Sequence, residues 1–325
     1  MILARPIPIE WNPELSIYAS ESFLQAVSDE YGWIGGFDES DELRCILPYT
    51  IIKKSFYRLL RFRVATIAFG KELSIWEEKD FLNRTISLFR IAGVDMLIPA
   101  TTNTIFRTYP DGADAAPYGT YIVNLDLPEE VLWRAFSSSH RRKVRLAEKR
   151  GVAVESDMEF LPVVYDQVKS TFKRSALPFM NFPAFARMIT GLGTNVKIFV
   201  ASSQGIIQAS LVLPFSNYSA YFVYGGSNIH PEYGAANLLH WTAMQWCKNH
   251  GIHRYDFVGV RINPKKGSKQ EGLKIFKERF GGNLVQGYMW KYAFHPFKCA
   301  GYSLAVRLLR GGDIVDHERH KMSQS

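Results

Sequence analysis

Hydrophobic and polar positions along the chain follow the same order twice. Residues 33–51 read as a strand, an acidic turn and a second strand that ends at Ile46-Leu47-Pro48-Tyr49. Residues 197–215 read as a strand, a turn at 202–205 and a second strand that ends at Val212-Leu213-Pro214-Phe215. Apolar runs on both sides of a short polar turn are typical of hairpins, so the sequence predicts two similar hairpins.

A helix and a further strand follow each hairpin. The helical stripes consist of Phe81, Leu82, Ile86, Phe89 and Ile91 in the first copy, and of Leu238, Leu239, Thr242, Ala243 and Trp246 in the second. Gly93 and Gly251 follow these stripes and suit left-handed helix caps. Strands are predicted after them, over 94–98 and 252–260. The interval between the copies is similar at the Leu-Pro corner and at the glycine, which indicates an internal repeat.

The repeat and the chain length together predict the fold class. A chain of 325 residues is long for a single core. The order of elements predicts mixed sheets of the α/β (α+β) type in two tandem domains. We expect these domains over residues 1–125 and 126–295, with the tail 296–325 packed on the first. A helix over Glu129–Arg150, ending before Gly151, is expected to open the second domain.

Composition and charge narrow the class of protein. The chain is 47% hydrophobic and 22% charged, which favours a folded globular protein. We find no uninterrupted apolar run long enough to span a bilayer and no secretory signal, so a cytoplasmic location is expected. Cys45, Cys247 and Cys299 are scattered, which predicts neither disulfides nor a metal site. The net charge of +8 indicates an anionic partner, which could be nucleic acid, a phosphorylated substrate or an acidic membrane.

Three segments are candidates for binding or chemistry. The basic run 140–150 fits either a solvated helix face or a phosphate-binding patch. The Gly/Lys-rich segment 263–282 fits either an anion seat at a helix start or a flexible loop, and it lacks the P-loop spacing. The strand 221–228 runs into Gly225-Gly226, which fits either a turn or a splayed strand whose N–H groups face an acyl carbonyl.

Several classes of site lack their signatures. There is no GxSxG motif, and His240 on its helical stripe is interpreted as a packed residue rather than a catalyst. Helix–turn–helix and zinc-finger patterns are also missing, so duplex DNA is not expected as a partner.

Three motifs resemble the FemAB/FemX family of peptidoglycan aminoacyltransferases and the related acyltransferases of polysaccharide gene clusters. They are Tyr121-Ile122-Val123-Asn124-Leu125 followed by Ser139-His140-Arg141-Arg142-Lys143-Val144, then Tyr224-Gly225-Gly226-Ser227, and finally Tyr255-Asp256-Phe257-Val258-Gly259 followed by Gly272-Leu273, Phe276-Lys277 and Phe280-Gly281. The resemblance covers roughly residues 120–290. It implies two tandem domains of the GNAT (acetyltransferase-like) fold, and attack of an amine on an activated ester or thioester.

The resemblance also implies residue roles. Lys277 matches a lysine near the donor that would stabilise negative charge, and Asp256 matches a strand-end acid that would orient or deprotonate the acceptor amine. The candidate substrate-binding residues are Arg141, Arg142, Arg145, Arg174, Tyr224, Gly225, Ser227 and Tyr255. We expect no bound cofactor. The donor is either aminoacyl-tRNA or acyl-CoA, and tRNA is therefore a candidate partner.

One segment departs from the acetyltransferase pattern. The loop that binds the coenzyme A pyrophosphate in such folds corresponds here to Pro231-Glu232-Tyr233-Gly234-Ala235-Ala236. Proline replaces the first position, and Glu232 would repel phosphate, although Gly234 and Ala236 remain. This favours an aminoacyl donor without excluding coenzyme A.

The combined hypothesis is an N-acyltransferase that acts on an amine of a cell-envelope precursor, either a peptidoglycan peptide or an amino sugar of a polysaccharide. The alternative is a non-catalytic module that binds tRNA or an anionic polymer. In the tail, apolar residues alternate with Lys298, Arg307 and Arg310, so contact with an anionic membrane at its inner face is a further possibility. Packing of the tail on the first lobe explains the same residues and is preferred. The sequence does not indicate an oligomeric state.

Overall fold

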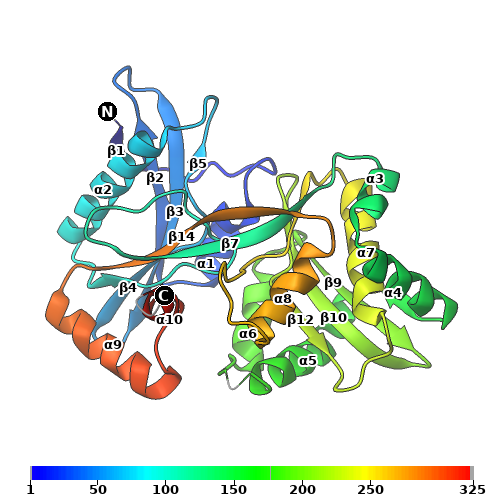
Figure 1. Cartoon of the computed structure of the whole chain (residues 1–325). Coiled ribbons are helices and arrows are strands. Elements are labelled where there is room, and N and C mark those ends of the chain that lie inside the picture. Colours follow the sequence, from blue (N-terminus) through cyan, green and yellow to red (C-terminus); the bar gives the residue numbers. More distant parts are fainter. Residues whose placement is uncertain (1, 176, 323–325) are drawn as a thin grey trace.

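Two long antiparallel strands run through the middle of the molecule and belong to both of its lobes (Figure 1). They are β7 (Asp114–Asn124) and β14 (Asn283–Ala293), paired from Lys291↔Asp114 to Asn283↔Ile122. The structure is a computed structural model that describes residues 2–175 and 177–322. Trp290 of β14 lies in the core of the first lobe, whereas Tyr121 of β7 lies in the core of the second.

The first lobe contains the N-terminal strands, two α-helices and a 3-10 turn. Its strands are β1 (Leu3–Ile7), β2 (Glu30–Phe37), β3 (Leu43–Lys54), β4 (Tyr57–Phe62), β5 (Ile67–Ala68) and β6 (Met96–Leu97), and its helices are the 3-10 turn Ile17–Ala19, α1 (Glu21–Ala26) and α2 (Ile75–Ile91). The helix α2 begins before its apolar stripe because Ser74 and Glu77 form a capping box. It ends before Gly93, which has the predicted left-handed conformation at φ +70°.

The second lobe carries most of the helices. Its elements are α3 (Glu129–Ala135), α4 (Ser138–Lys149), β8 (Ala153–Glu155), the 3-10 turn Met158–Phe160, α5 (Leu161–Lys173), α6 (Phe182–Thr190), β9 (Val196–Ser203), β10 (Ile206–Pro214), β11 (Ala220–Tyr221), β12 (Tyr224–Ser227), α7 (Ala235–Asn249), β13 (Arg254–Asp256) and α8 (Lys269–Glu278). The tail forms α9 (Pro296–Arg310) and α10 (Ile314–Met322).

The described strands form two sheets. The ten-stranded sheet has the order β1-β2-β3-β4-β6-β14-β7-β13-β11, with β5 paired to β3, and it crosses from one lobe to the other. The four-stranded sheet has the order β12-β10-β9-β8. The pairs β4·β6 and β11·β13 are parallel among otherwise antiparallel neighbours. The predicted α/β fold with mixed sheets is therefore confirmed.

The helix predicted over Glu129–Arg150 is wrong as one element, because it is broken into α3 and α4. Phe136 adopts an extended conformation at the break and is buried. Ser137 then caps a new helix by accepting a 3.3 Å hydrogen bond from the amide of His140. Burial of one aromatic side chain thus overrides the helical pattern.

Two predicted strands are also shorter than expected. Of the strand predicted over 252–260, only β13 forms, because the backbone turns at Val258 and Gly259. The strand predicted over 221–228 is divided between the two sheets: β11 pairs with β13, whereas β12 pairs with β10. The second lobe therefore opens where these two short strands diverge.

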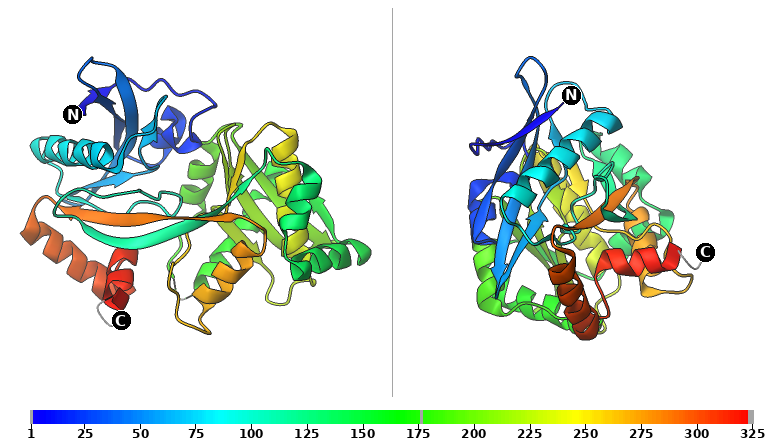
Figure 2. Two further views of the ribbon diagram at one scale, coloured as in Figure 1. Left: turned by 45° about the horizontal axis from the view of Figure 1, so that its top comes forward. Right: turned by 90° about the vertical axis from the view of Figure 1, so that its left-hand side faces the viewer.

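The tail helices lie along the first lobe, on the opposite side of the long strand pair from α2 (Figure 2). Cys299 of α9 packs with Leu59, Met96 and Ile98. Val315 of α10 packs with residues of β7 and β14. Within the described ranges, no helix has both the length and the apolar character needed to cross a bilayer.

Candidate functional site

Asp256 ends β13 and organises the turn that follows it. Its carboxylate is buried, with 5% of the residue exposed. One carboxylate oxygen, Oδ1, accepts a 2.5 Å hydrogen bond from the hydroxyl of Thr120 on β7 and a 2.7 Å hydrogen bond from the amide of Val258. Thr120 lies on the central strand shared by the lobes, so the carboxylate is held by a rigid element.

Lys277 reaches the same turn from α8. Ser268 caps this helix by accepting a hydrogen bond from the amide of Glu271, and the helix buries Lys277 near its C-terminal end. The ammonium group donates to the carbonyl oxygens of Val258 and Gly259, the latter at 2.7 Å. An ammonium group has three N–H donors, so one is used by no hydrogen bond among the described residues.

The turn itself has an uncommon backbone. Val258 and Gly259 both have φ of +40°, a conformation that β-branched residues rarely adopt. A Cβ on Gly259 would lie 2.9 Å from Cβ of Thr102 and 2.9 Å from the hydroxyl of Tyr118. Such a turn is unfavourable on its own, and the hydrogen bonds of Asp256 and Lys277 stabilise it.

Burial shifts the pKa values of both charged groups towards neutrality. It raises the pKa of Asp256 to about 6, against the opposing effects of Thr120, the Val258 amide and Lys277. It lowers the pKa of Lys277 to about 8, against the opposing effect of Asp256. Two groups that change protonation close to pH 7 are characteristic of a site for proton transfer.

A cavity of about 350 Å³ lies beside this turn and takes its lining from both lobes. The polar lining residues are Tyr18, Arg61, Arg63, Thr101, Thr102, Asn103 and Tyr224. The carbonyl oxygen of Thr102 accepts a 2.9 Å hydrogen bond from the amide of Gly259, which joins the cavity wall to the turn. The cavity is thus linked to the turn through Thr102, although Asp256 and Lys277 are not among its lining residues.

The cavity has a mainly apolar lining that includes the guanidinium groups of Arg61 and Arg63. Burial lowers the pKa of Arg63 to about 9, and its guanidinium donates to the hydroxyl of Thr50 at 2.9 Å. The hydroxyl of Tyr18 is buried and has no hydrogen-bond partner among the described residues. Two guanidinium groups beside an unpartnered phenol suit an anionic or strongly polar ligand.

Most of the predicted substrate-binding residues lie outside this cavity. Tyr224 lines it, and Gly225 and Ser227 follow on β12. Arg174, which follows α5, donates to the carbonyl oxygen of Ser227 on β12 at 3.3 Å, so these two predicted residues are brought together. Tyr255 is fully buried, and its hydroxyl forms a 2.7 Å hydrogen bond with Nδ1 of His240.

The basic residues of α4 have different surroundings from one another. Arg141 donates to the backbone carbonyls of Arg134 and Phe136, so its guanidinium caps α3. Arg142 is exposed, and the guanidinium of Arg145 lies 5.6 Å from the ring centroid of Trp133. Figure 1 places α4 at the edge of the second lobe that faces away from the first lobe.

The loop before α7 is closed against α4. A Cβ on Gly234, which has φ of +88°, would collide with the carbonyl oxygen of Lys143. Glu232 forms an ion pair with Arg150, with 2.5 Å between a carboxylate oxygen and a guanidinium nitrogen. The start of α7 therefore faces a backbone carbonyl and a carboxylate, an arrangement that disfavours a pyrophosphate there.

Three features of this site are not apparent in the sequence pattern. Thr120 is 136 residues from Asp256 in the chain, and Tyr18 and Arg63 lie in the other lobe from β13. No local motif marks any of them. The Tyr-Asp-x-Val-Gly segment is the one signal that leads to the turn on which they converge.

Comparison with known proteins gives consistent matches. The model of the FemAB family matches residues 202–305. The Lipid II:glycine glycyltransferase of Staphylococcus saprophyticus is 28% identical over 223 residues, which cover 67% of this chain and 45% of that protein. The chain thus spans less than half the length of that relative.

Solved structures agree on the fold. The crystal structure of FemX has a TM-score of 0.64 at 18% identity, with 90% of this chain and 95% of that chain covered. A tandem GNAT protein from the clavulanic acid biosynthesis pathway has a TM-score of 0.50 at 10% identity, with 91% and 99% covered. The resemblance drawn from the motifs is confirmed: the chain is similar to FemAB-family proteins and shares the tandem GNAT-like fold of these structures.

Proposed function

We propose that the protein transfers an aminoacyl or acyl group from an activated donor to an amine of a cell-envelope precursor. The observation that carries this proposal is the buried pair of Asp256 and Lys277 on the two sides of one left-handed turn. The relationship to a Lipid II:glycine glycyltransferase supports a peptidoglycan peptide as the acceptor. An amino sugar of a polysaccharide is the other candidate.

The pair fits the chemistry of amine acylation. The acceptor ammonium must lose a proton before its nitrogen attacks the donor carbonyl carbon, and the Asp256 carboxylate accepts that proton. The attack produces a tetrahedral oxyanion, to which Lys277 donates its remaining N–H. The oxyanion then collapses and the bond to the ester oxygen or thioester sulfur breaks. The leaving group takes up the proton held by Asp256, and the nitrogen releases its second proton to solvent.

The donor is better matched by aminoacyl-tRNA than by acyl-CoA. The start of α7 lies against the carbonyl oxygen of Lys143, and Glu232 is beside it, so the usual seat of a coenzyme A pyrophosphate is unfavourable. The exposed Arg142 and the nearby Arg145 offer instead a surface for tRNA phosphates. No cofactor takes part in this scheme.

The acceptor is assigned to the cavity between the lobes. Arg61 and Arg63 would bind its phosphate groups, and the Tyr18 hydroxyl would gain a hydrogen-bond partner. A lipid-linked acceptor of this kind would bring the protein to the inner face of the membrane.

The test is a transfer assay with purified components. Radiolabelled aminoacyl-tRNAs and acetyl-CoA are each supplied with lipid II, with its nucleotide-linked precursor and with amino-sugar acceptors. Lys277→Met should reduce transfer by at least about 100-fold, because it removes the donor to the oxyanion. Lys274→Met is the matched control: it lies on the same helix and donates to the carbonyl of Ile262 at 2.9 Å.

Two outcomes would contradict the proposal. One is no transfer from any donor to any acceptor of the panel. The other is tRNA binding that is unchanged in both Lys277→Met and Asp256→Asn, without turnover, which is the behaviour of a non-catalytic binding module.

A further inference from the structure

The helix α9 has two different faces. On one face, Cys299 packs into a small core with Leu59, Met96 and Ile98, and Tyr302 packs against it. The opposite face is exposed although its large side chains are apolar. The exposed fractions are 95% for Phe297, 58% for Leu304 and 78% for Leu308. Leu309 is 82% exposed but projects about 120° from Phe297, on the side of Lys298.

The exposed apolar residues form a stripe. At 3.6 residues per turn, Phe297, Leu304 and Leu308 project within about 40° of one another. Soluble monomers rarely expose an apolar stripe of this kind unless it contacts a partner. The helix therefore carries more apolar surface than its packing on the first lobe requires.

Cations lie on both flanks of the stripe. Lys298 projects about 100° to one side of Phe297 and Arg307 about 80° to the other, on the same helical geometry. The sequence of α9, PFKCAGYSLAVRLLR, contains no acidic residue. An apolar stripe between two basic flanks is the pattern of helices that lie in the plane of an anionic membrane surface.

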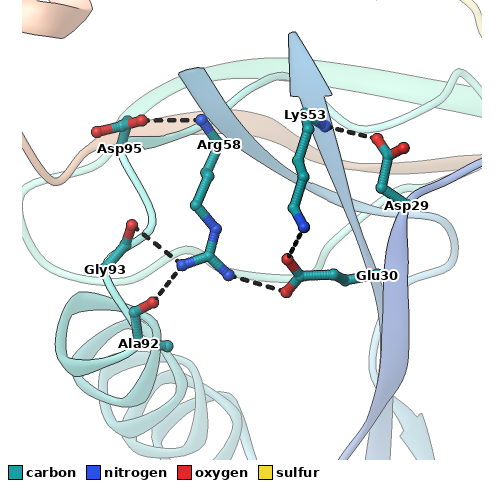
Figure 3. A network of polar contacts seen from close by, with 7 residues as sticks. All are labelled: Asp29, Glu30, Lys53, Arg58, Ala92, Gly93 and Asp95. Carbon is teal, nitrogen blue, oxygen red and sulfur yellow. Dashed lines mark hydrogen bonds and ion pairs between the residues drawn. The ribbon is translucent and has the colours of Figure 1, made fainter. Parts of the chain in front are cut away.

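The helix is firmly attached, so its stripe has a fixed direction. The carboxylate of Asp95 forms a 2.6 Å ion pair with the ammonium of Lys298. The backbone carbonyl of Asp95 accepts a 3.1 Å hydrogen bond from the amide of His295. The same carboxylate accepts a 2.8 Å hydrogen bond from the backbone amide of Arg58. The guanidinium of Arg58 donates to the carbonyl oxygens of Ala92 and Gly93 (Figure 3). This network connects the start of α9 to β4 and to the end of α2.

Phe56 extends the apolar surface beyond the helix. It lies in the turn between β3 and β4 and is 67% exposed. Its ring centroid is 4.2 Å from that of Tyr57, which is in turn 5.4 Å from the ring of Tyr302 on α9. Lys53 and Lys54 precede this turn and are largely exposed, so the added surface is also apolar with basic neighbours.

We propose that Phe56, Phe297, Leu304 and Leu308 form a docking surface for an anionic lipid bilayer. The apolar side chains enter the boundary between head groups and acyl chains. Arg307 and Lys54 contact the lipid phosphates, whereas the Lys298 ammonium stays paired with Asp95.

Charge favours a bilayer over the other occupants. In a symmetric dimer through this face, the basic flanks of one copy would meet the basic flanks of the other, with no acidic residue of α9 to compensate. An RNA would be attracted by the cations but would gain little from the exposed leucines. Only an anionic bilayer matches both the stripe and its flanks.

The test uses the full chain and vesicle sedimentation, without donor or acceptor. Wild-type protein should pellet with vesicles of phosphatidylcholine and phosphatidylglycerol, and far less with phosphatidylcholine alone. The triple variant Phe297→Ser, Leu304→Ser, Leu308→Ser should bind at least tenfold more weakly. Arg307→Gln should weaken binding to the anionic vesicles selectively.

The matched control is on α2. Trp76 and Ile91 are 79% and 86% exposed, so Trp76→Ser, Ile91→Ser removes similar apolar surface from another helix and should leave vesicle binding unchanged. Circular dichroism should show that both variants fold, since all substituted side chains are exposed.

Three results would overturn the proposal. They are no sedimentation of the wild-type protein with anionic vesicles, equal binding by the triple variant, or a shift from dimer to monomer in the triple variant with vesicle binding unchanged. The outcome is separable from the proposed transfer activity, because the triple variant should transfer normally to a water-soluble acceptor.

Discussion

Asp256 and Lys277 bind the two polar groups of one backbone residue: the carboxylate accepts from the amide of Val258, and the ammonium donates to the carbonyl of the same residue. The two charges therefore depend on the same short turn for their positions. A change in either group can be tested separately, because each also has a second partner.

Replacement of Asp256 by asparagine should abolish most of the transfer while the fold is kept. The amide oxygen of asparagine can accept the hydrogen bonds from Thr120 and Val258 but cannot take a proton from the amine. We expect kcat to fall by about 10²- to 10⁴-fold and KM to stay within a few-fold. Steady-state kinetics measures the loss of transfer, and thermal melting measures whether the fold is kept. If the variant unfolds and transfer is lost for that reason, the role of Asp256 as the proton acceptor is contradicted.

The pH dependence of transfer should be bell-shaped. Asp256 must be ionised, so the rate should rise as the pH increases through about 6; Lys277 must be protonated, so the rate should fall as the pH increases through about 8. Thr120→Val removes a hydrogen bond that lowers the pKa of Asp256, which should move the acidic limb to higher pH. Thr85→Val, at a buried threonine of α2, should leave both limbs in place.

The arginines of α4 should separate into structural and binding residues. Arg142→Gln with Arg145→Gln should weaken tRNA binding and make it less dependent on salt, with the slope falling by about one for each phosphate that is no longer bound. Arg141→Gln should instead lower the free energy of unfolding by about 1 kcal/mol, since it caps α3. Filter binding over a salt series measures tRNA affinity, and urea unfolding measures stability, for both variants. Equal losses of tRNA affinity in the two variants would contradict the separate roles.

Tyr255 should act through stability rather than substrate binding. Tyr255→Phe leaves Nδ1 of the buried His240 without its partner, so unfolding should become easier by about 1 kcal/mol, with KM unchanged. Tyr18→Phe is the comparison in a stability assay, because the Tyr18 hydroxyl has no partner among the described residues and its removal should have a smaller effect.

Local patterns predicted the elements that depend on neighbouring residues. Gly93 and Gly251 are in the left-handed conformation after their helices, as their positions indicate, and Leu213-Pro214 ends β10. The expected strand end at Leu47-Pro48 is wrong, because β3 continues to Lys54 and pairs there with β4. These features depend on turn chemistry and periodicity, which the sequence displays directly.

Features that depend on distant contacts were not predictable in this way. The break at Phe136 arises because its ring packs edge-on against Trp241 and Phe280, at centroid distances of 5.2 and 5.1 Å. The hydrogen bond from Thr120 to Asp256 joins two strands far apart in the chain. The repeat also gave no sign that β7 and β14 would contribute to both cores.

The strand pair β7·β14 acts as a common spine, and this limits how the molecule can move. Swinging one half away from the other would break backbone hydrogen bonds along a register that runs from Lys291↔Asp114 to Asn283↔Ile122. Reactants must then come and go through side-chain and loop movements rather than through hinged opening. On heating, the two halves should melt together as one cooperative unit.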